Sequence, residues 1–138
     1  MANALLELDV LTPVGAVATV KVAGVEIPGA LGELGVLPGH IPFVSPLRPG
    51  VVRYRDDQAD IRMAVGAGFV EVSAEGRVSV LTERALRSDE IDVDAARREL
   101  TDAQSAAKAS SAPVGSAERT VLEQQLDWLE AQLRAAAH

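Results

Sequence analysis

The hydrophobic pattern of this chain changes its period near Thr82, and that change constrains the fold more than any other feature. Before Thr82, branched apolar residues alternate with polar ones in short runs separated by Gly, Pro and Asp, which is typical of β-strands. After Thr82, apolar residues recur every three or four positions, as on one face of an α-helix. We therefore expect a β-domain at residues 1–88 and a helical domain at residues 89–138.

Short strands are expected throughout the first part. In the run 51–55, Arg53 and Arg55 fall on one face while Val52 and Tyr54 fall on the other, as a half-solvated strand requires. The predicted strands are Leu5–Leu11, Ala16–Val22, Gly35–Leu37, Phe43–Ser45, Val51–Arg55, Ile61–Val65, Phe69–Ser73 and Val78–Leu81. Many short strands favour two packed sheets, because closure limits exposed strand edges. The sequence therefore predicts an antiparallel β-sandwich.

Turns and irregular connections are indicated by Pro and Gly. Residues 23–50 contain Pro28, Pro38, Pro42, Pro46 and Pro49. Because proline cannot donate to a strand ladder, we expect this stretch to hold irregular connections rather than central strands. Hairpin loops are expected at residues 56–60 and 74–76, the second with Gly76 able to adopt a positive φ.

The second part predicts two helices. The first carries Val93, Ala96, Leu100, Ala103 and Ala107, and the second carries Leu122, Leu126, Leu129 and Leu133. Pro113 and Gly115 break the pattern between them, and Ser116 is placed to cap the second helix. The α+β fold expected is thus a β-sandwich followed by an antiparallel helical hairpin.

The hairpin is expected to be held weakly. Alanines on the first helix offer little volume to receive leucines from the second, and isolated helices of this length are marginal in water. Docked and undocked states are then separated by only a few kcal/mol, so we expect a mobile tail. Trp128 lies beside the leucine stripe, where it is either an anchor for a partner or a core residue at the solvent edge.

Composition excludes several classes of function. The net charge is −7 without any basic run, which argues against binding to nucleic acid. The absence of Cys excludes thiolate nucleophiles and Cys-based zinc sites. The longest apolar runs fall short of the ~20 residues that span a bilayer, and the N-terminus lacks a basic region, so no membrane-spanning or targeting segment is expected.

Two groups of residues could form a catalytic or metal-binding site. His40 could act as a general base for Ser45, or pair with Glu33, in a small hydrolase, but no nucleophile motif accompanies it. We therefore favour a loop histidine that contacts backbone or another subunit. The acidic residues Asp89, Glu90, Asp92 and Asp94 could attract a divalent cation. Acidic residues near the N-terminus of a helix are explained by their favourable interaction with the helix dipole. We therefore predict no catalytic or metal site.

Four segments carry a resemblance to a known family. They are the opening Leu8-Asp9-Val10-Leu11-Thr12-Pro13; Gly32-Glu33-Leu34-Gly35-Val36-Leu37-Pro38-Gly39-His40-Ile41-Pro42 with its continuation Leu47-Arg48-Pro49-Gly50-Val51-Val52; Gly66-Ala67-Gly68-Phe69-Val70-Glu71-Val72; and Val78-Ser79-Val80-Leu81-Thr82. Over residues 5–94 the chain resembles the epsilon subunits of F-type proton-translocating ATP synthases.

The resemblance implies a non-catalytic rotor subunit with about ten strands and two helices. Such a subunit sits in the central stalk, where it couples rotation of the c-subunit ring to the gamma subunit for ATP synthesis driven by a proton gradient. In the family, the position of Glu33 reaches the polar loops of the c ring, and the position of His40 lies near gamma. The lack of a transit peptide implies a bacterial-type protein at the cytoplasmic face of the cell membrane, associated with the membrane through partners only.

The resemblance also implies a regulatory role for the helices. In the family they either fold against the sandwich or extend into the alpha/beta catalytic head and block ATP hydrolysis. Here the last helix offers Arg119 and Arg134 among several acidic residues, so we expect modest inhibition. The family's ATP-binding motif is matched only with a two-residue shift, which leaves Asp92 and Arg97 as candidate contacts for a regulatory ATP. An ATP-sensing nucleotide-binding module is the alternative function; no other cofactor is implied.

Overall fold

The computed structural model describes residues 4–56 and 59–137, so residues 57 and 58 of the predicted loop at 56–60 lie outside the described residues. In these described ranges, ten strands precede two helices. The strands are β1 Leu6–Thr12, β2 Gly15–Val22, β3 Val25–Gly29, β4 Gly32–Val36, β5 Phe43–Leu47, β6 Gly50–Arg55, β7 Asp60–Val65, β8 Gly68–Val72, β9 Arg77–Thr82 and β10 Ala85–Arg87. A 3-10 turn, η1 (Ser88–Glu90), leads into α1 (Val93–Ala109) and α2 (Ala117–Ala136).

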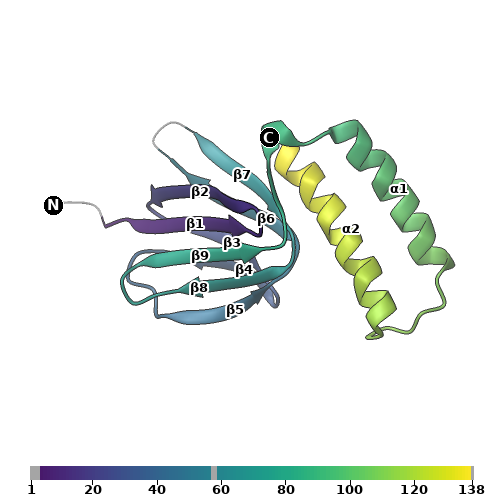
Figure 1. Ribbon diagram of the computed structural model, residues 1–138, viewed down its shortest axis with the longest axis horizontal. Coiled ribbons are helices and arrows are strands. Elements are labelled where there is room, and N and C mark those ends of the chain that lie inside the picture. The colour runs from purple at the N-terminus through teal and green to yellow at the C-terminus, as the bar shows by residue number, and fades with distance from the viewer. Residues whose placement is uncertain (1–3, 57–58, 138) are drawn as a thin grey trace.

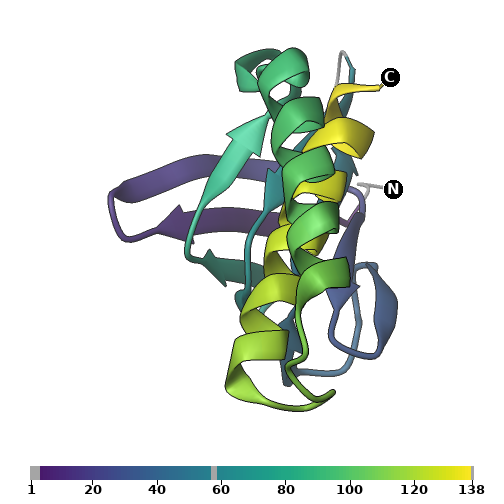
Figure 2. The ribbon, with the colours of Figure 1, turned by 90° about the vertical axis from the view of Figure 1, so that its right-hand side faces the viewer.

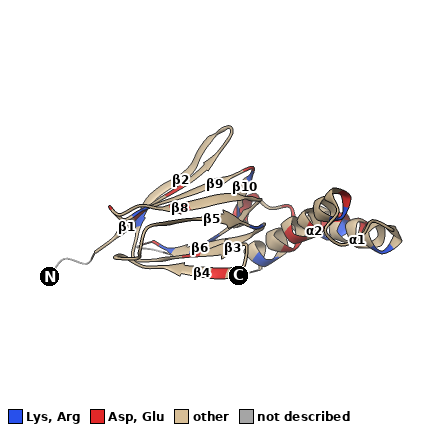
Figure 3. Ribbon diagram, turned by 90° about the horizontal axis from the view of Figure 1, so that it is seen from below, with Lys and Arg blue, Asp and Glu red and all other residues tan. Residues whose placement is uncertain are grey.

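The strands form one continuous sheet that folds over itself into two layers. One layer contains β10-β7-β6-β3 with β4 paired to β3, and the other contains β5-β8-β9-β1-β2. The layers are joined where β3 meets β5 at Gly29 and Leu47. Figure 3 shows β3, β4 and β6 beneath β1, β2, β5, β8 and β9. Neighbouring strands are antiparallel except for β1 and β9, which are parallel. The predicted β-sandwich is confirmed.

Alternation along the strands builds the core between the layers. On β6, Val52 and Tyr54 are buried while Arg53 and Arg55 are exposed, as predicted. The largest fully buried side chains are Leu6, Leu8, Ile27, Met63, Leu129, Val10, Val22, Val36, Val52, Val65, Val70 and Val78. All of these except Leu129 belong to strands. The turn at Gly76 has the expected positive φ of 83°.

The expectation of irregular connections at residues 23–50 is wrong at Val25–Gly29, which forms β3, whereas β4 and β5 overlap the predicted strands Gly35–Leu37 and Phe43–Ser45. Pro28 is tolerated because the pairing of β3 with β6 stops at Glu26, which leaves Pro28 with a partner strand on one side only. The carbonyl of Pro28 accepts from Arg48 N at 3.0 Å. Between the sandwich and the helices, residues 85–90 form β10 and η1.

The helices form the predicted antiparallel hairpin. Asp92 caps α1 by accepting from Ala95 N at 3.0 Å, and Ser116 caps α2 by accepting from Arg119 N at 3.2 Å. Helix α2 lies between the sandwich and α1, and the two helices run side by side (Figures 1 and 2). Within the described residues, no helix is long and apolar enough to cross a membrane.

Candidate functional site

The hairpin is attached to the sandwich by a second, smaller core, which we call the hairpin dock. Trp128, Ala131 and Ala135 of α2 pack with Ala64 of β7, and all four are buried. Val51, Leu86 and Ile91 pack against the edge of this cluster. Val51, Ala64 and Leu86 are paired across β6, β7 and β10, so they form one row on the outer face of the sheet. The hairpin dock therefore covers a short apolar row and leaves the rest of that face open.

Trp128 proves to be a core residue of this dock, with only 5% of its surface exposed. The guanidinium of Arg84 lies 4.3 Å from the ring centroid, in cation–π geometry. Asp127 forms an ion pair with Arg48 at 3.7 Å beside it. Of the four leucines in the stripe, only Leu129 is fully buried, and Trp128 with two alanines makes the contact with the sheet.

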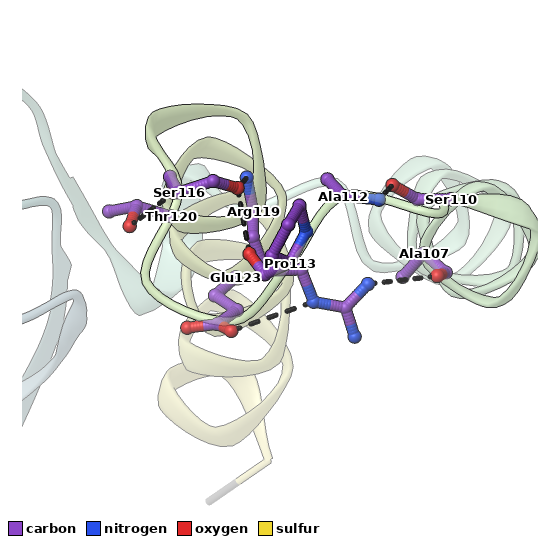
Figure 4. A network of polar contacts seen from close by, with 8 residues as sticks. All are labelled: Ala107, Ser110, Ala112, Pro113, Ser116, Arg119, Thr120 and Glu123. Carbon is purple, nitrogen blue, oxygen red and sulfur yellow. Dashed lines mark hydrogen bonds and ion pairs between the residues drawn. The ribbon is translucent and has the colours of Figure 1, made fainter.

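The turn of the hairpin is closed by polar contacts that Figure 4 shows. Arg119 of α2 reaches across to α1, where its Nη1 donates to the carbonyl of Ala107 at 3.0 Å. Its Nε lies 3.6 Å from a carboxylate oxygen of Glu123. Ser116 donates to the carbonyl of Pro113 at 2.7 Å. Arg119 thus ties the end of α1 to the beginning of α2.

Glu33 lies at the beginning of β4, next to the tip of the β3–β4 hairpin. It is exposed and pairs across the ladder with Pro28. Leu31 at the same tip is fully exposed, which is unusual for a large apolar residue. The carboxylate of Glu33 shares two surface hollows with Arg134 from the last turn of α2. The tip therefore presents an apolar side chain beside a mixed-charge surface.

His40 lies in the exposed loop between β4 and β5. Its Nδ1 is 2.9 Å from the carbonyl oxygen of Ile41, and its ring centroid is 5.0 Å from that of Phe43. Ser45 donates its hydroxyl to the carbonyl of Pro46 at 3.1 Å. Among the described residues, no hydrogen bond joins His40 to Ser45 or Glu33. The structure thus does not assemble the groups of the hydrolase alternative.

Asp92 and Arg97 are not brought together around a cavity. Asp92 is occupied as the cap of α1, and Arg97 is exposed on the same helix. Glu90 accepts from Arg87 N at 2.8 Å, so it also serves the local backbone. Within the part of the chain that the structure describes, no cluster of three or more acidic or His residues suits a metal ion. The nucleotide contact at Asp92 and Arg97 stays a prediction.

An exposed apolar row, which the sequence did not predict, crosses the outer face of the other layer. The ladder registers align Pro46 with Phe69, Phe69 with Leu81, and Leu81 with Leu11. Phe69 and Leu81 are exposed by 55% and 46%. Val44, two residues along β5 from Pro46, adds a further exposed side chain. The signal was present in each run as an apolar residue at a solvent-facing position, but only the register joins these positions.

Charged pairs reinforce both outer faces. On β6, Arg53 donates to both carboxylate oxygens of Asp60 at 3.2 and 2.9 Å, and this hydrogen bonding lowers the pKa of Asp60. On β9, Arg77 donates to Asp9 and Glu7 of β1, and the bond to Asp9 raises the pKa of Arg77. These ion pairs join neighbouring strands, so they support a stiff sheet.

Comparison with known proteins is consistent over both parts of the chain. Residues 5–88 match the family model of the ATP synthase delta/epsilon chain β-sandwich domain. A protein of Geotalea uraniireducens (strain Rf4) named ATP synthase epsilon chain is 41% identical over 103 residues, covering 75% of this chain and 74% of the relative. A protein of Magnetococcus marinus with the same name is 36% identical over 130 residues, covering 94% and 93%.

Solved structures also match in fold. A chain in the cryo-EM structure of the Euglena gracilis mitochondrial ATP synthase, OSCP/F1/c-ring, gives a TM-score of 0.79 at 27% identity and covers 98% of this chain and 82% of that chain. A chain in the central stalk and c-ring structure of the Tetrahymena thermophila enzyme gives 0.65 at 13% identity, covers 99% of each chain and shows the fold alone. The sandwich, the hairpin and the matched relatives together show that this chain belongs to the epsilon-chain family of ATP synthases.

Proposed function

We propose that this chain is a rotor subunit in the central stalk of an F-type ATP synthase, where it couples rotation of the c ring to the gamma subunit. The observation that carries the proposal is the likeness of 98% of the chain to a chain in an F1/c-ring assembly. A ten-stranded body cross-linked by ion pairs such as Arg77 with Asp9 is suited to transmitting torque, because a close-packed interior deforms little. The ATP-sensing alternative is not favoured, since the matched relatives are named ATP synthase epsilon chains.

The subunit performs this role without an active site of its own. Among the described residues, the only histidine, His40, is turned to its own loop and to Phe43. The hydroxyl of Ser45 donates to backbone. Nucleophilic catalysis needs a nucleophile within hydrogen-bond reach of a base, and this pair does not meet that condition.

Two surfaces make the contacts with partners. Glu33, beside exposed Leu31 at the β3–β4 tip, contacts the c ring. His40 contacts gamma from the exposed loop that leads into β5, and the outer apolar row, which includes Val44 and Pro46 of β5, makes a further contact. An apolar patch that is rimmed by polar residues is typical of an interface.

The helical hairpin at residues 89–138 is a regulatory unit that separates from the sandwich at residues 1–88. Its extended form reaches the alpha/beta catalytic head and inhibits ATP hydrolysis modestly. In this form α2 presents Arg119 and Arg134 to the head together with its own four acidic residues. This acidic excess limits the affinity of α2 for an acidic surface. Asp92 and Arg97 supply the contacts if a regulatory ATP binds. The assembled subunit lies at the cytoplasmic face of the bacterial cell membrane, held there by its partners.

Cysteine cross-linking tests the two contacts directly, because the chain contains no cysteine of its own. Glu33→Cys and His40→Cys would each be assembled with the remaining subunits and oxidised after introduction of cysteines into the c-ring loops and gamma. We expect Glu33→Cys to cross-link to the c ring and His40→Cys to gamma. Glu75→Cys, in the exposed β8–β9 turn, is the matched control. Failure of the chain to co-purify with gamma and the c ring would refute the rotor assignment.

A further inference from the structure

Two chain segments cross between the sheet layers side by side, next to the hairpin dock. Residues 66–67 lead from β7 to β8, and residues 83–84 lead from β9 to β10, so both connect one layer to the other. The backbone joins the two segments twice. Gly66 N donates to the carbonyl of Arg84 at 2.9 Å, and Glu83 N donates to the carbonyl of Ala67 at 3.1 Å. We call this pair of segments the crossover strap.

The side chain of Thr82 lies where the second segment of the strap begins, and only 5% of the residue is exposed. Its Oγ1 lies 2.9 Å from the carbonyl oxygen of Gly66, 3.0 Å from that of Arg84 and 3.4 Å from that of Ala67. A threonine hydroxyl offers one donor, so a single proton serves carbonyl groups from both segments. Removal of the hydroxyl leaves these acceptors with one donor fewer, which is unfavourable in a buried place.

Arg84 is the last residue of the strap, and its side chain reaches the hairpin. Its guanidinium carbon lies over the ring of Trp128, 4.3 Å from the ring centroid. An added Cβ at Gly66 would lie 3.1 Å from Cγ of Arg84, so the arginine stem runs against the bare Cα of this glycine. Nε of Arg84 lies 3.9 Å from a carboxylate oxygen of Glu83. The strap therefore sets the direction of the arginine, and the head of the arginine meets the tryptophan.

The contact between Arg84 and Trp128 adds a directional term to a small dock. Trp128 packs there with three alanines, Ala64, Ala131 and Ala135. A guanidinium attracts a tryptophan ring within about 6 Å of the ring centroid, and the attraction grows as the site loses water. Trp128 is buried, so this condition is met on its side. A displacement of Arg84 by a few ångströms would forfeit much of the attraction.

We propose that the crossover strap is a latch for the hairpin: the hydroxyl of Thr82 fixes the backbone of Arg84, and Arg84 holds Trp128 in the docked position. Thr82 is then a positioning residue that acts through Arg84. Release of the hairpin depends on the geometry at which the two layers exchange strands, as well as on helix packing. Docking can be measured in the full-length chain alone, so the latch stands or falls independently of the rotor and inhibitory roles proposed above.

Thiol labelling measures release of the hairpin, because the chain contains no cysteine of its own. Ala135→Cys places a thiol in the dock, where it reacts when the hairpin separates. Val78→Cys places one in the core between the layers, where it reacts when the sandwich opens. We expect Thr82→Val, which keeps the shape and removes the hydroxyl, to raise the labelling rate of Ala135→Cys by about fivefold, the scale of a partly exposed cation–π contact. Thr82→Ser keeps the hydroxyl and should restore the slow rate.

Arg84→Gln tests the second half of the latch. It should raise the labelling rate of Ala135→Cys by about the same factor, because it removes the cation from the tryptophan ring. Arg55→Gln removes an exposed arginine of β6 outside the dock and should leave the rate unchanged. In the Arg84→Gln background, Thr82→Val should add nothing to this rate, because the residue through which Thr82 acts is gone.

Three outcomes would overturn the latch. One is that Thr82→Val accelerates labelling of Val78→Cys alone, as a purely structural role of the hydroxyl would. Another is that its effect on Ala135→Cys persists undiminished together with Arg84→Gln. The third is that Arg84→Gln accelerates labelling no more than Arg55→Gln. This last comparison decides the matter even if Thr82→Val does not fold, since the side chain of Arg84 is 45% exposed and its replacement leaves the core intact.

Discussion

Replacing Ala131 by Glu should release the hairpin from the sandwich without unfolding either part. A tryptophan buries about 150–250 Å² on packing. At ~25 cal/mol per Å² the burial of Trp128 contributes roughly 4–6 kcal/mol before the cost of ordering the helices is subtracted. Ala131 is fully buried in the same cluster. The effective penalty for burying an unpaired carboxylate is several kcal/mol, which matches or exceeds what the hairpin dock provides.

Helix α2 itself should survive this change. Glutamate has a helix propensity close to that of the better helix formers, so Ala131→Glu costs only a few tenths of a kcal/mol within the helix. The core between the two sheet layers is a separate cluster that contains neither Trp128 nor Ala131. We therefore expect the equilibrium to shift toward the undocked hairpin while the sandwich remains folded.

Trp128 is the sole tryptophan of the chain, so its fluorescence reports the hairpin dock directly. In Ala131→Glu we expect red-shifted emission, increased quenching by acrylamide and faster amide exchange in α2 and β7, with unchanged exchange in β1 and β9. Gln124→Glu, which adds the same charge at an exposed position of α2, should leave all these signals unaltered. The reasoning is refuted if Trp128 in Ala131→Glu keeps blue-shifted emission and protection from quencher.

Two further predictions concern the sandwich. A Cβ at Gly68 would lie 1.9 Å from the carbonyl oxygen of Leu81, so Gly68→Ala should destabilise the sandwich by about 1–3 kcal/mol, measured by urea unfolding. At Gly35 an added Cβ meets no neighbouring atom, so Gly35→Ala should be nearly neutral. Equal effects of the two substitutions would contradict the packing argument. The hydrogen bonds from Arg53 hold the pKa of Asp60 below its ordinary 3.8, so the stability due to this pair is present at neutral pH and is lost as pH falls below that value. The difference in unfolding free energy between the natural chain and Arg53→Gln should therefore shrink from about pH 7 to about pH 3, and a constant difference would show that the pair does not stabilise the fold.

Much of the fold could be predicted from local sequence patterns. The alternation in the run 51–55 placed Arg53 and Tyr54 on the correct faces, and Ser116 was recognised as a helix cap. These features depend on neighbours within a few residues, so spacing alone identifies them. The strand at Val25–Gly29 was missed because Pro28 argues against a strand, and its tolerance depends on how far the ladder with β6 extends.

The candidate site could be predicted from the sequence only in part. Motifs drew attention to Glu33 and His40, and both are exposed in loops or at a strand end as an interface requires. The role of Trp128 stayed open, because its spacing in α2 does not say which face meets the sheet. The outer apolar row could not be assembled either, since each strand contributes one or two residues and only the register aligns them.

The sequence by itself determined the kinds of element, their order and the division between a strand-rich and a helical part, because periodicity and capping act over a few residues. The tertiary structure alone decided that α2 docks through Trp128 on Ala64 and that Arg84 lies over the ring of Trp128. Arg84 and Trp128 are far apart along the chain, and only sheet register and the packing of α2 bring them together. Sheet register and helix packing depend on the free energy of the whole folded chain, which no local pattern encodes.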